Sequence, residues 1–530
     1  MTVLGVLTDW RKLLIYTHRW LGVAGCLVFV VWFVSGVAMM YWRMPRLTAE
    51  ERLMRMEALD LSALTVSAAD AAANGGISPT RVRVAMLDGR PVYRFLADGK
   101  WSAVWADNGT PLGAVNADEA MATMEALVPE HAAGLRYEER LVAPDQWTLQ
   151  SVIRDHLPLH KIAVGDEAGT HYYVSSHTGE PVLKTDRYGR FWGYWSAVLH
   201  WTYFPVLRSR TEFWNQLIIW ASGIGSLMCL GGLALGVWRL SLRRRYRLKG
   251  IPSHSPYAGF MKWHHYAGLL FGAVTLTWAF SGMLSLGPWD FLGNSPAPRS
   301  LEEAATGGPL SLAALVPDAL REAREVIGEA FVPKELEFLQ FRGHSYVMAY
   351  RPPEPREAHT WTNTDIAAFQ ALEIDREHAI VSVLEPERGV FRRFPDAAMS
   401  DVAHAALPGV AIADATWLDA YDAYYYDRDG HKPLPVLRVR YADPERTWLY
   451  LNPHHGTIAA RNEAGSRWNR WLYQGLHSLD FPFMYYSRPL WDIVVIGLSV
   501  GGALVSATTI IPAVRRLRRR VRYLGRRLRA

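Results

Sequence analysis

Four histidines lie beside or within apolar stretches of the sequence, and they form two pairs in similar contexts. His18 and His264 each open an apolar run, "HRWLGVAG" and "HHYAGLLF", while His200 and His477 each precede a Phe-Pro step and a further apolar run. An ionisable side chain in or beside a membrane span is costly unless it has a partner or a function. Imidazole is an axial ligand of haem iron, and two such ligands make an electron-transfer centre. The sequence therefore raises the hypothesis of two haem sites, one held by His18 and His264 and one by His200 and His477.

The pairing of these histidines comes from an internal repeat. A shift of 246 residues without a gap places the first apolar run on the third, aligning Gly22 with Gly268 and two Trp-x-x-Ser-Gly motifs. A shift of 277 residues aligns the segments before the second and fourth runs, including their Phe-Pro steps. Each half is expected to contain a span, an extracytoplasmic domain, a histidine-bearing segment and a second span. We therefore predict an internal two-fold duplication.

Glycines are predicted on the helix face that carries each histidine of the first pair. With 3.6 residues per turn, Gly22 lies about one turn from His18 and Gly268 one turn from His264. Small-residue stripes in spans usually mark close helix packing, but they also let a flat, bulky group approach the backbone. Gly22 and Gly268 are therefore candidate cofactor-binding residues.

Four apolar runs are long enough to cross a bilayer, which takes about 20 residues. They are expected near residues 20–42, 213–238, 265–287 and 490–513. Basic residues flank the first run, fill the segment between the second and third, and follow the fourth. The positive-inside rule then places both termini and the middle segment in the cytoplasm. The predicted fold is an α-helical membrane bundle of four transmembrane helices with two α+β extracytoplasmic domains.

The predicted organisation follows the repeat. It comprises the N-terminus with the first span (1–43), a first extracytoplasmic domain (44–190), a histidine-bearing segment with the second span (191–240), a cytoplasmic loop (241–263), the third span (264–287), a second extracytoplasmic domain (288–466), a histidine-bearing segment with the fourth span (467–513) and a basic tail (514–530). Alternating apolar residues around Gly-containing and Asp-Pro turns predict β-hairpins in 92–113, 171–183 and 436–459. Segments 61–74 and 311–327 predict helices, each opened by a serine that could cap it.

Charge and motifs exclude several function classes. The net charge is +6, but the basic residues lie beside spans, where orientation and anionic lipid account for them; lipid is an expected partner and nucleic acid is not. Cys26 and Cys229 lie inside spans, and without a Cys-x-x-Cys-His motif covalent c-type haem is excluded. No dinucleotide-binding glycine motif and no Walker A motif is present, so no nucleotide or flavin domain is expected.

Two arginines are further candidates for holding the cofactor. Arg208 and Arg488 follow the two Phe-Pro steps, and a guanidinium group suits the carboxylate of a haem propionate. Anchoring to lipid headgroups is the alternative. His265 is a rival to His264 as a ligand, although the repeat register aligns His265 with Arg19.

Two other clusters leave alternatives open. The tyrosine- and aspartate-rich segment 421–431 could line a pocket for a metal chelate or belong to a protein core. The loose group of His156, His160 and His171 occurs in one half only and could form a surface metal site.

The chain resembles the PepSY-associated transmembrane proteins. The resemblance rests on "HRWLG" and "HHYAG" with their Trp-x-x-Ser-Gly motifs, on the hairpin sequence "TGEPV", and on "LHW-x-x-FP". It covers the four spans and the flanking hairpins and is weaker over residues 300–440. The resemblance implies periplasmic PepSY-like domains, b-type haem and a bacterial inner-membrane location with cytoplasmic termini. Carried over to this sequence, the ligand role falls on His18, His264, His200 and His477.

The resemblance also implies reduction of ferric iron, often as a ferric siderophore, on the periplasmic side during iron uptake. The expected function is therefore a haem-dependent ferric or ferric-siderophore reductase with two haem b groups, whose electron donor is quinol or a separate reductase. The larger second extracytoplasmic domain leaves the substrate open. Two rival functions remain: a PepSY-type periplasmic binding or regulatory membrane protein without redox activity, and a proton-coupled transporter whose histidines carry protons.

Overall fold

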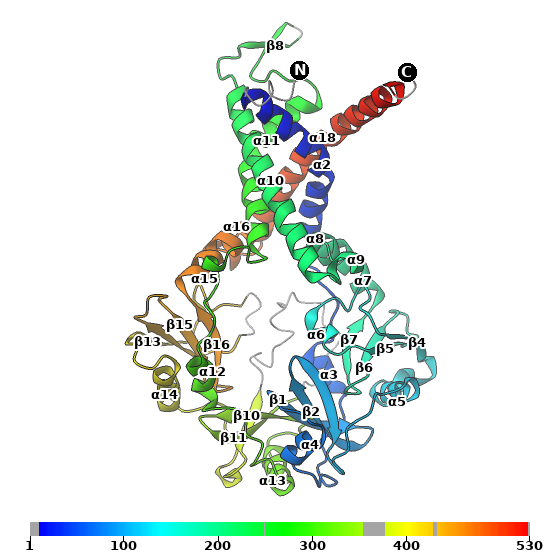
Figure 1. Cartoon of the computed structure of the whole chain (residues 1–530), viewed down its shortest axis with the longest axis vertical. Coiled ribbons are helices and arrows are strands. Elements are labelled where there is room, and N and C mark those ends of the chain that lie inside the picture. Colours follow the sequence, from blue (N-terminus) through cyan, green and yellow to red (C-terminus); the bar gives the residue numbers. More distant parts are fainter. Residues whose placement is uncertain (1–9, 249, 353–376, 428–431, 528–530) are drawn as a thin grey trace. The chain divides into compact units, whose positions relative to one another are not determined.

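The chain divides into two compact units, each built from both halves of the sequence (Figure 1). The computed structural model describes residues 10–248, 250–352, 377–427 and 432–527. The helical unit comprises Met1–Arg43, Tyr194–Gly293 and Ser466–Ala530, and the strand-rich unit comprises Met44–Gly193 and Asn294–Gly465.

Four long helices make up most of the helical unit: α2 (Trp10–Met39), α10 (Thr211–Arg239), α11 (Phe260–Leu284) and α18 (Leu490–Arg527). All four are long and apolar enough to cross a membrane, in agreement with the four predicted spans. Helix α18 begins where the fourth span was predicted, but it continues through Pro512 to Arg527. Leucine and arginine favour the helical conformation, so the basic tail extends the helix of the span.

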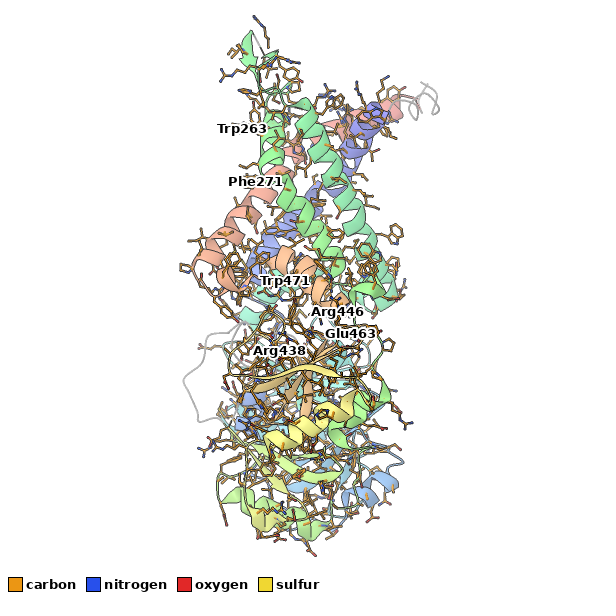
Figure 2. All side chains as sticks on the ribbon, turned by 90° about the vertical axis from the view of Figure 1, so that its left-hand side faces the viewer. Trp263, Phe271, Arg438, Arg446, Glu463 and Trp471 are labelled. Carbon is orange, nitrogen blue, oxygen red and sulfur yellow. The ribbon has the colours of Figure 1, made fainter. Side chains whose placement is uncertain are left out.

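The long helices form a closed ring. Helices α2 and α11 each contact both α10 and α18, so α2 and α11 lie diagonally across the bundle. Glycines allow the helices to approach, because the ring of Phe33 packs over Gly502 and the ring of Phe271 packs over Gly501. Phe271 lies near the middle of α11 (Figure 2). Trp263, near the start of α11, is exposed, as expected for an apolar side chain that faces lipid.

Smaller elements connect the long helices of this unit. They are η2 (Tyr194–Val198), α8 (Leu199–Trp201), α9 (Pro205–Arg208), β8 (Tyr246–Leu248), β9 (Ile251–Ser253), η3 (Asp290–Leu292), η6 (Arg470–Gly475), α16 (Leu476–Ser478) and α17 (Pro482–Tyr485). Strands β8 and β9 pair as a two-stranded hairpin between α10 and α11. Helices α7 (Arg187–Gly193) and α15 (Ala464–Asn469) lead into the two π-helical turns η2 and η6.

One antiparallel sheet of the strand-rich unit contains strands from both halves of the sequence. Its order is β12-β11-β10-β1-β2-β3, with β1 at Arg81–Leu87, β2 at Arg90–Ala97, β3 at Lys100–Trp105, β10 at Glu335–Phe341, β11 at His344–Tyr350 and β12 at His378–Ser382. At the centre, β1 pairs with β10, so that Val84 lies opposite Leu336. Helices α4 (Ala68–Asn74) and α13 (Pro317–Gly328) pack on this sheet and share one buried core with it.

Each half also contributes a four-stranded sheet of its own. The first contains β4 (Arg136–Leu141), β5 (Leu159–Ala163), β6 (His171–Ser175) and β7 (Pro181–Thr185), and the second contains β13 (Ile412–Leu418), β14 (Val436–Tyr441), β15 (Trp448–Asn452) and β16 (Thr457–Asn462). Helix α5 (Ala117–Leu127) covers the first sheet and α14 (Asp396–Ala406) the second. The remaining elements are α3 (Ala49–Arg55), η1 (Pro129–Gly134), α6 (Ser151–Arg154), α12 (Arg299–Thr306) and η5 (Pro386–Arg388).

The predicted hairpins are present, but the predicted helices were too long. Strands β2–β3, β6–β7 and β14–β15–β16 pair antiparallel. The tight turn of the first hairpin falls at Asp98-Gly99, where both residues have positive φ. Helix α4 begins after Ser67, which caps it. Helix α13 begins at Pro317, a residue suited to the first helical position, so Ser311 does not cap it.

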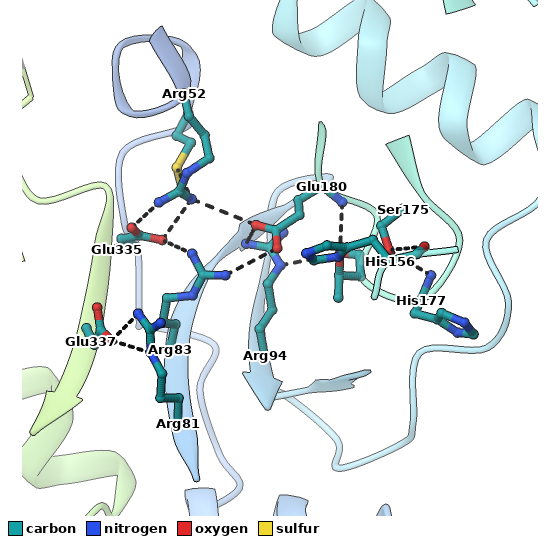
Figure 3. A network of polar contacts seen from close by, with 12 residues as sticks. Arg52, Arg81, Arg83, Arg94, His156, Ser175, His177, Glu180, Glu335 and Glu337 are labelled. Carbon is teal, nitrogen blue, oxygen red and sulfur yellow. Dashed lines mark hydrogen bonds and ion pairs between the residues drawn. The ribbon is translucent and has the colours of Figure 1, made fainter. Parts of the chain in front are cut away.

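A buried ion cluster connects the two halves at the centre of the shared sheet (Figure 3). The carboxylate of Glu180 lies 3.3 Å from the guanidinium group of Arg83 and 3.6 Å from that of Arg94. Arg83 also pairs with Glu335 of β10 at 3.5 Å, and Arg52 pairs with Glu335. Burial opposes ionisation of Glu180, but Arg83, Arg94 and Arg52 hold its pKa well below the ordinary value. The cluster therefore contains charged groups, which β1 and β10 bring together.

Candidate functional site: two histidine pairs in the helical unit

His18 and His264 meet across the bundle, although they lie on diagonal helices. Their ring centroids are 6.2 Å apart. Nδ1 of His18 lies 3.0 Å from the carbonyl oxygen of Met228, and Nδ1 of His264 lies 2.9 Å from that of Val505. A carbonyl oxygen can only accept a hydrogen bond, so each Nδ1 carries the ring proton. Each Nε2 therefore keeps its lone pair, as a metal-binding imidazole requires.

The second pair, His200 and His477, lies in two short helices of matching construction. Each helix follows a π-helical turn, a geometry often found at functional sites. Each also ends in a left-handed residue, Thr202 with φ 55° and Leu479 with φ 51°.

Two indoles hold these short helices in place. Trp214 of α10 donates its ring N–H to the carbonyl oxygen of Trp201, and Trp491 of α18 donates to that of Ser478, at 3.1 and 2.8 Å. The indoles thereby tie each histidine-bearing segment to the long helix that follows it.

The rings of His200 and His477 are also close, with centroids 6.0 Å apart. Nδ1 of His200 lies 3.1 Å from the carbonyl oxygen of Trp32 and 3.3 Å from the hydroxyl of Ser35. Nδ1 of His477 lies 3.1 Å from the hydroxyl of Ser281. Both serines are fully buried. The carbonyl oxygen of Trp32 can only accept, so Nδ1 of His200 carries the proton and its Nε2 is available. His477 has the same tautomer when the hydroxyl of Ser281 accepts from its Nδ1–H.

The ring separations fit one metal ion between the members of each pair. An imidazole nitrogen binds a metal at about 2.0–2.1 Å. The ring centre lies roughly 1 Å behind that nitrogen, so two rings on opposite sides of one metal have centres about 6 Å apart. On α2, 17 residues separate His18 from Ser35, which at about 1.5 Å per residue places the two pairs about 25 Å apart along the bundle.

The glycines near the histidines divide into two kinds. A Cβ added to Gly22 or Gly268 would meet no protein atom within 4 Å. A Cβ added to Gly232 of α10 would instead lie 3.0 Å from Nδ1 of His18, and one added to Gly36 would lie 3.2 Å from Cε1 of His200. The backbone of Gly22 and of Gly268 therefore borders open space on the side where a Cβ would lie. Gly232 and Gly36 instead leave room for the imidazole rings of His18 and His200.

His265, the rival of His264, has both ring nitrogens hydrogen bonded. Nδ1 lies 2.8 Å from the hydroxyl of Ser255, and Nε2 lies 2.9 Å from the carbonyl oxygen of Gly236. With no nitrogen available, His265 does not fit a ligand role in this arrangement. In the described part of the chain, no group of three or more His, Cys, Asp or Glu side chains is arranged to hold a metal ion.

Arg208 and Arg488 both have partners within the protein. Arg488 donates two hydrogen bonds to the carboxylate of Asp492, at 2.9 and 2.7 Å. Arg208 donates to the hydroxyl of Thr211 at 2.7 Å, and its guanidinium group lies 4.8 Å from the ring of Trp214. Their interaction with a propionate stays a prediction.

In the tyrosine-rich segment, residues 421–427 pack into a protein core rather than line an open pocket. Tyr425 is fully buried, stacks on Tyr450 at 5.2 Å and donates to the carbonyl oxygen of Pro433. Asp422 accepts hydrogen bonds from Tyr450 and Arg438. Residues 428–431 lie outside the described residues.

The three histidines of the loose cluster have separate surroundings. His156 stacks on Trp101, and both nitrogens of His160 make hydrogen bonds within its own sheet region. His171 lies 3.6 Å from Glu138. They do not form a joint metal site.

No protein-family model matches the chain, and no curated protein matches it. The functional argument therefore rests on the two histidine pairs. Sequence reasoning selected the four histidines but missed their hydrogen-bond acceptors. The signal for two of these acceptors was present, because Ser35 and Ser281 are the serines of the repeated Trp-x-x-Ser-Gly motif.

Proposed function

We propose that the protein is an internally duplicated, inner-membrane b-haem electron-transfer protein of the PepSY-associated type. It reduces ferric iron or a ferric siderophore in the periplasm for iron uptake. The observation that carries the proposal is the presence of two imidazole pairs, each with ring centres about 6 Å apart and each with Nδ1 hydrogen bonded.

The composition of the sites favours haem over a bare metal ion. Protein-bound transition metals usually take four or more ligands, and two imidazoles supply only two. A porphyrin would supply the remaining ligands, while His18 with His264, and His200 with His477, would supply the imidazoles. The open space before Gly22 and Gly268 supports this fit beside His18 and His264.

The contacts of the two pairs support a duplicated architecture. The acceptors Met228 and Val505 are related by the same 277-residue shift as His200 and His477, and Ser35 and Ser281 by the 246-residue shift of His18 and His264. Equivalent residues therefore make equivalent contacts in both halves.

Haem, when bound, supplies one-electron chemistry, and the protein's own residues give that chemistry position and direction. His18 and His264 would hold one group, and His200 and His477 the other. Under the proposed orientation, the first pair lies toward the cytoplasm and the second toward the periplasm. Electrons from quinol or a separate reductase would enter at the group held by His18 and His264 and would leave from the group held by His200 and His477 to the ferric substrate.

Absorption spectroscopy of the purified full chain in detergent tests the proposal. We expect a Soret band, an α band that sharpens with dithionite, and two haems per chain. Alanine substitution of any of His18, His264, His200 or His477 should lower the haem content toward one per chain. His265→Ala is the matched control, because His265 is buried beside His264 in α11 but has both ring nitrogens hydrogen bonded within the protein.

The rival functions predict different results. Colourless protein, or haem content unchanged in all four alanine variants, would contradict the proposal and leave a binding or regulatory protein or a proton-coupled transporter. Protein that binds haem but does not reduce ferric chelates when supplied with a reductant would contradict the reductase activity alone.

A further inference from the structure

The second histidine pair has a serine hydroxyl at each Nδ1 in addition to the carbonyl contact of His200. In the pair formed by His18 and His264, Nδ1 of each ring contacts a main-chain carbonyl oxygen, that of Met228 or Val505. In the pair formed by His200 and His477, a serine hydroxyl contacts each ring. A side-chain substitution can remove a hydroxyl but not a carbonyl group.

Each serine hydroxyl has a main-chain carbonyl to which it can donate, so its oxygen can accept from the imidazole N–H. Ser35 donates its own proton to the carbonyl oxygen of Val31 at 2.6 Å, and Ser281 donates to that of Trp278 at 3.3 Å. The oxygen lone pairs then face Nδ1–H of the histidines. Both serines are fully buried, so water does not compete for these contacts.

We infer that Ser35 and Ser281 are positioning residues that fix the tautomer of His200 and His477 and set the reduction potential of the haem they would hold. The inference rests on the proposed function, and it adds that the two haems can be tuned separately.

The direction of the effect follows from ligand basicity. An acceptor at Nδ1–H makes the imidazole a stronger electron donor to the metal at Nε2. A stronger donor stabilises ferric iron more than ferrous iron. Removing the hydroxyl should therefore make one-electron reduction of that haem easier and raise its midpoint potential.

The experiment is a potentiometric titration of the α band of the purified full chain, comparing wild type with Ser35→Ala, Ser281→Ala and the double variant. The component lost in His477→Ala identifies the haem of the second pair. In the double variant we expect the midpoint potential of this haem to rise. The reduced-to-oxidised ratio at a fixed potential should increase by up to about tenfold, which corresponds to about 59 mV for one electron.

Three controls separate tuning from a packing effect. Ser226→Ala removes another buried hydroxyl of the bundle, one that donates to the carbonyl oxygen of Ser222, and it should shift neither component. Ser281→Thr keeps the hydroxyl and should restore the wild-type potential. Ser281→Cys, with a weaker acceptor, should lie between wild type and Ser281→Ala, and it tests the same point should an alanine variant fold poorly.

The outcomes distinguish this inference from the proposed function. Protein without haem contradicts the proposed function. Protein with two haems in which the serine variants shift neither midpoint, or shift both equally, overturns the inference and leaves the proposed function standing.

Discussion

Glu180 is the charged residue whose neutralisation should most destabilise the strand-rich unit. Its carboxylate lies 3.3 Å from Arg83, 3.6 Å from Arg94 and 3.8 Å from Arg52. The side chain of Glu180 is 7% exposed, and that of Arg94 is 3% exposed. The Glu180→Gln substitution keeps the shape of the side chain but leaves these guanidinium groups buried with less compensating charge.

The expected loss of stability is large because the charges are buried. Removing one partner of a buried ion pair typically costs about 3–5 kcal/mol. For a unit of this size, 1 kcal/mol corresponds to about 2 °C in the midpoint of thermal unfolding. The unfolding midpoint of the strand-rich unit should therefore fall by about 6–10 °C. Glu303→Gln is the matched control, because Glu303 pairs with Arg299 at the surface, where side chains 41% and 84% exposed contribute about 0–1 kcal/mol.

Thermal unfolding of the full chain in detergent measures this difference, and hydrogen exchange locates it. The amides of β1 and β10 should exchange faster in Glu180→Gln than in wild type, because the cluster lies where these strands pair. A Glu180→Gln protein that unfolds within about 2 °C of the Glu303→Gln control would refute the claim that this cluster stabilises the junction of the two halves.

Three further predictions concern acid stability and the histidine sites. Burial lowers the pKa of His156 to about 4, below the unfolded value of about 6.5. The folded protein therefore keeps the ring neutral, and its free energy of unfolding should fall by about 3 kcal/mol as the pH drops from about 6.5 toward 4. Unfolding curves at several pH values should show a weaker pH dependence for His156→Phe than for wild type. Gly232→Ala should displace the ring of His18, since the new Cβ would lie 3.0 Å from Nδ1, and the haem content should fall by about one per chain. Gly22→Ala should fold normally, because the new methyl group meets no protein atom within 4 Å, but the variant should retain less haem. Gly497 is equally open, and Gly497→Ala should retain as much haem as wild type. Equal haem retention in the two variants would argue against cofactor contact at Gly22.

The spans and the histidine register could be predicted because both depend on local sequence. Apolar length alone identifies a span, and the repeat placed the four histidines in equivalent positions before any contact was known. The hairpins were also predictable, since turn residues and alternation act over a few neighbouring positions.

The remaining features depend on residues far apart in the chain. Met228, the acceptor for His18, is 210 residues away, and no periodicity relates the two. The pairing of β1 with β10 likewise depends on how both halves pack. Arg488 shows a local contact that the sequence analysis did not consider: it donates to Asp492, four residues further on in the first turn of α18, while its contact with a propionate stays a prediction.

The β1–β10 ladder joins strands from the two halves of the sequence in one sheet. A fragment that stops after α10 would contain β1, β2 and β3 but would leave the backbone of β1 without its neighbour. Open strand edges recruit strands from other molecules, and a second copy of the fragment could offer its own β1 in antiparallel fashion. Such half-length chains are expected to self-associate through that edge, and co-expression with the complementary half should suppress the self-association.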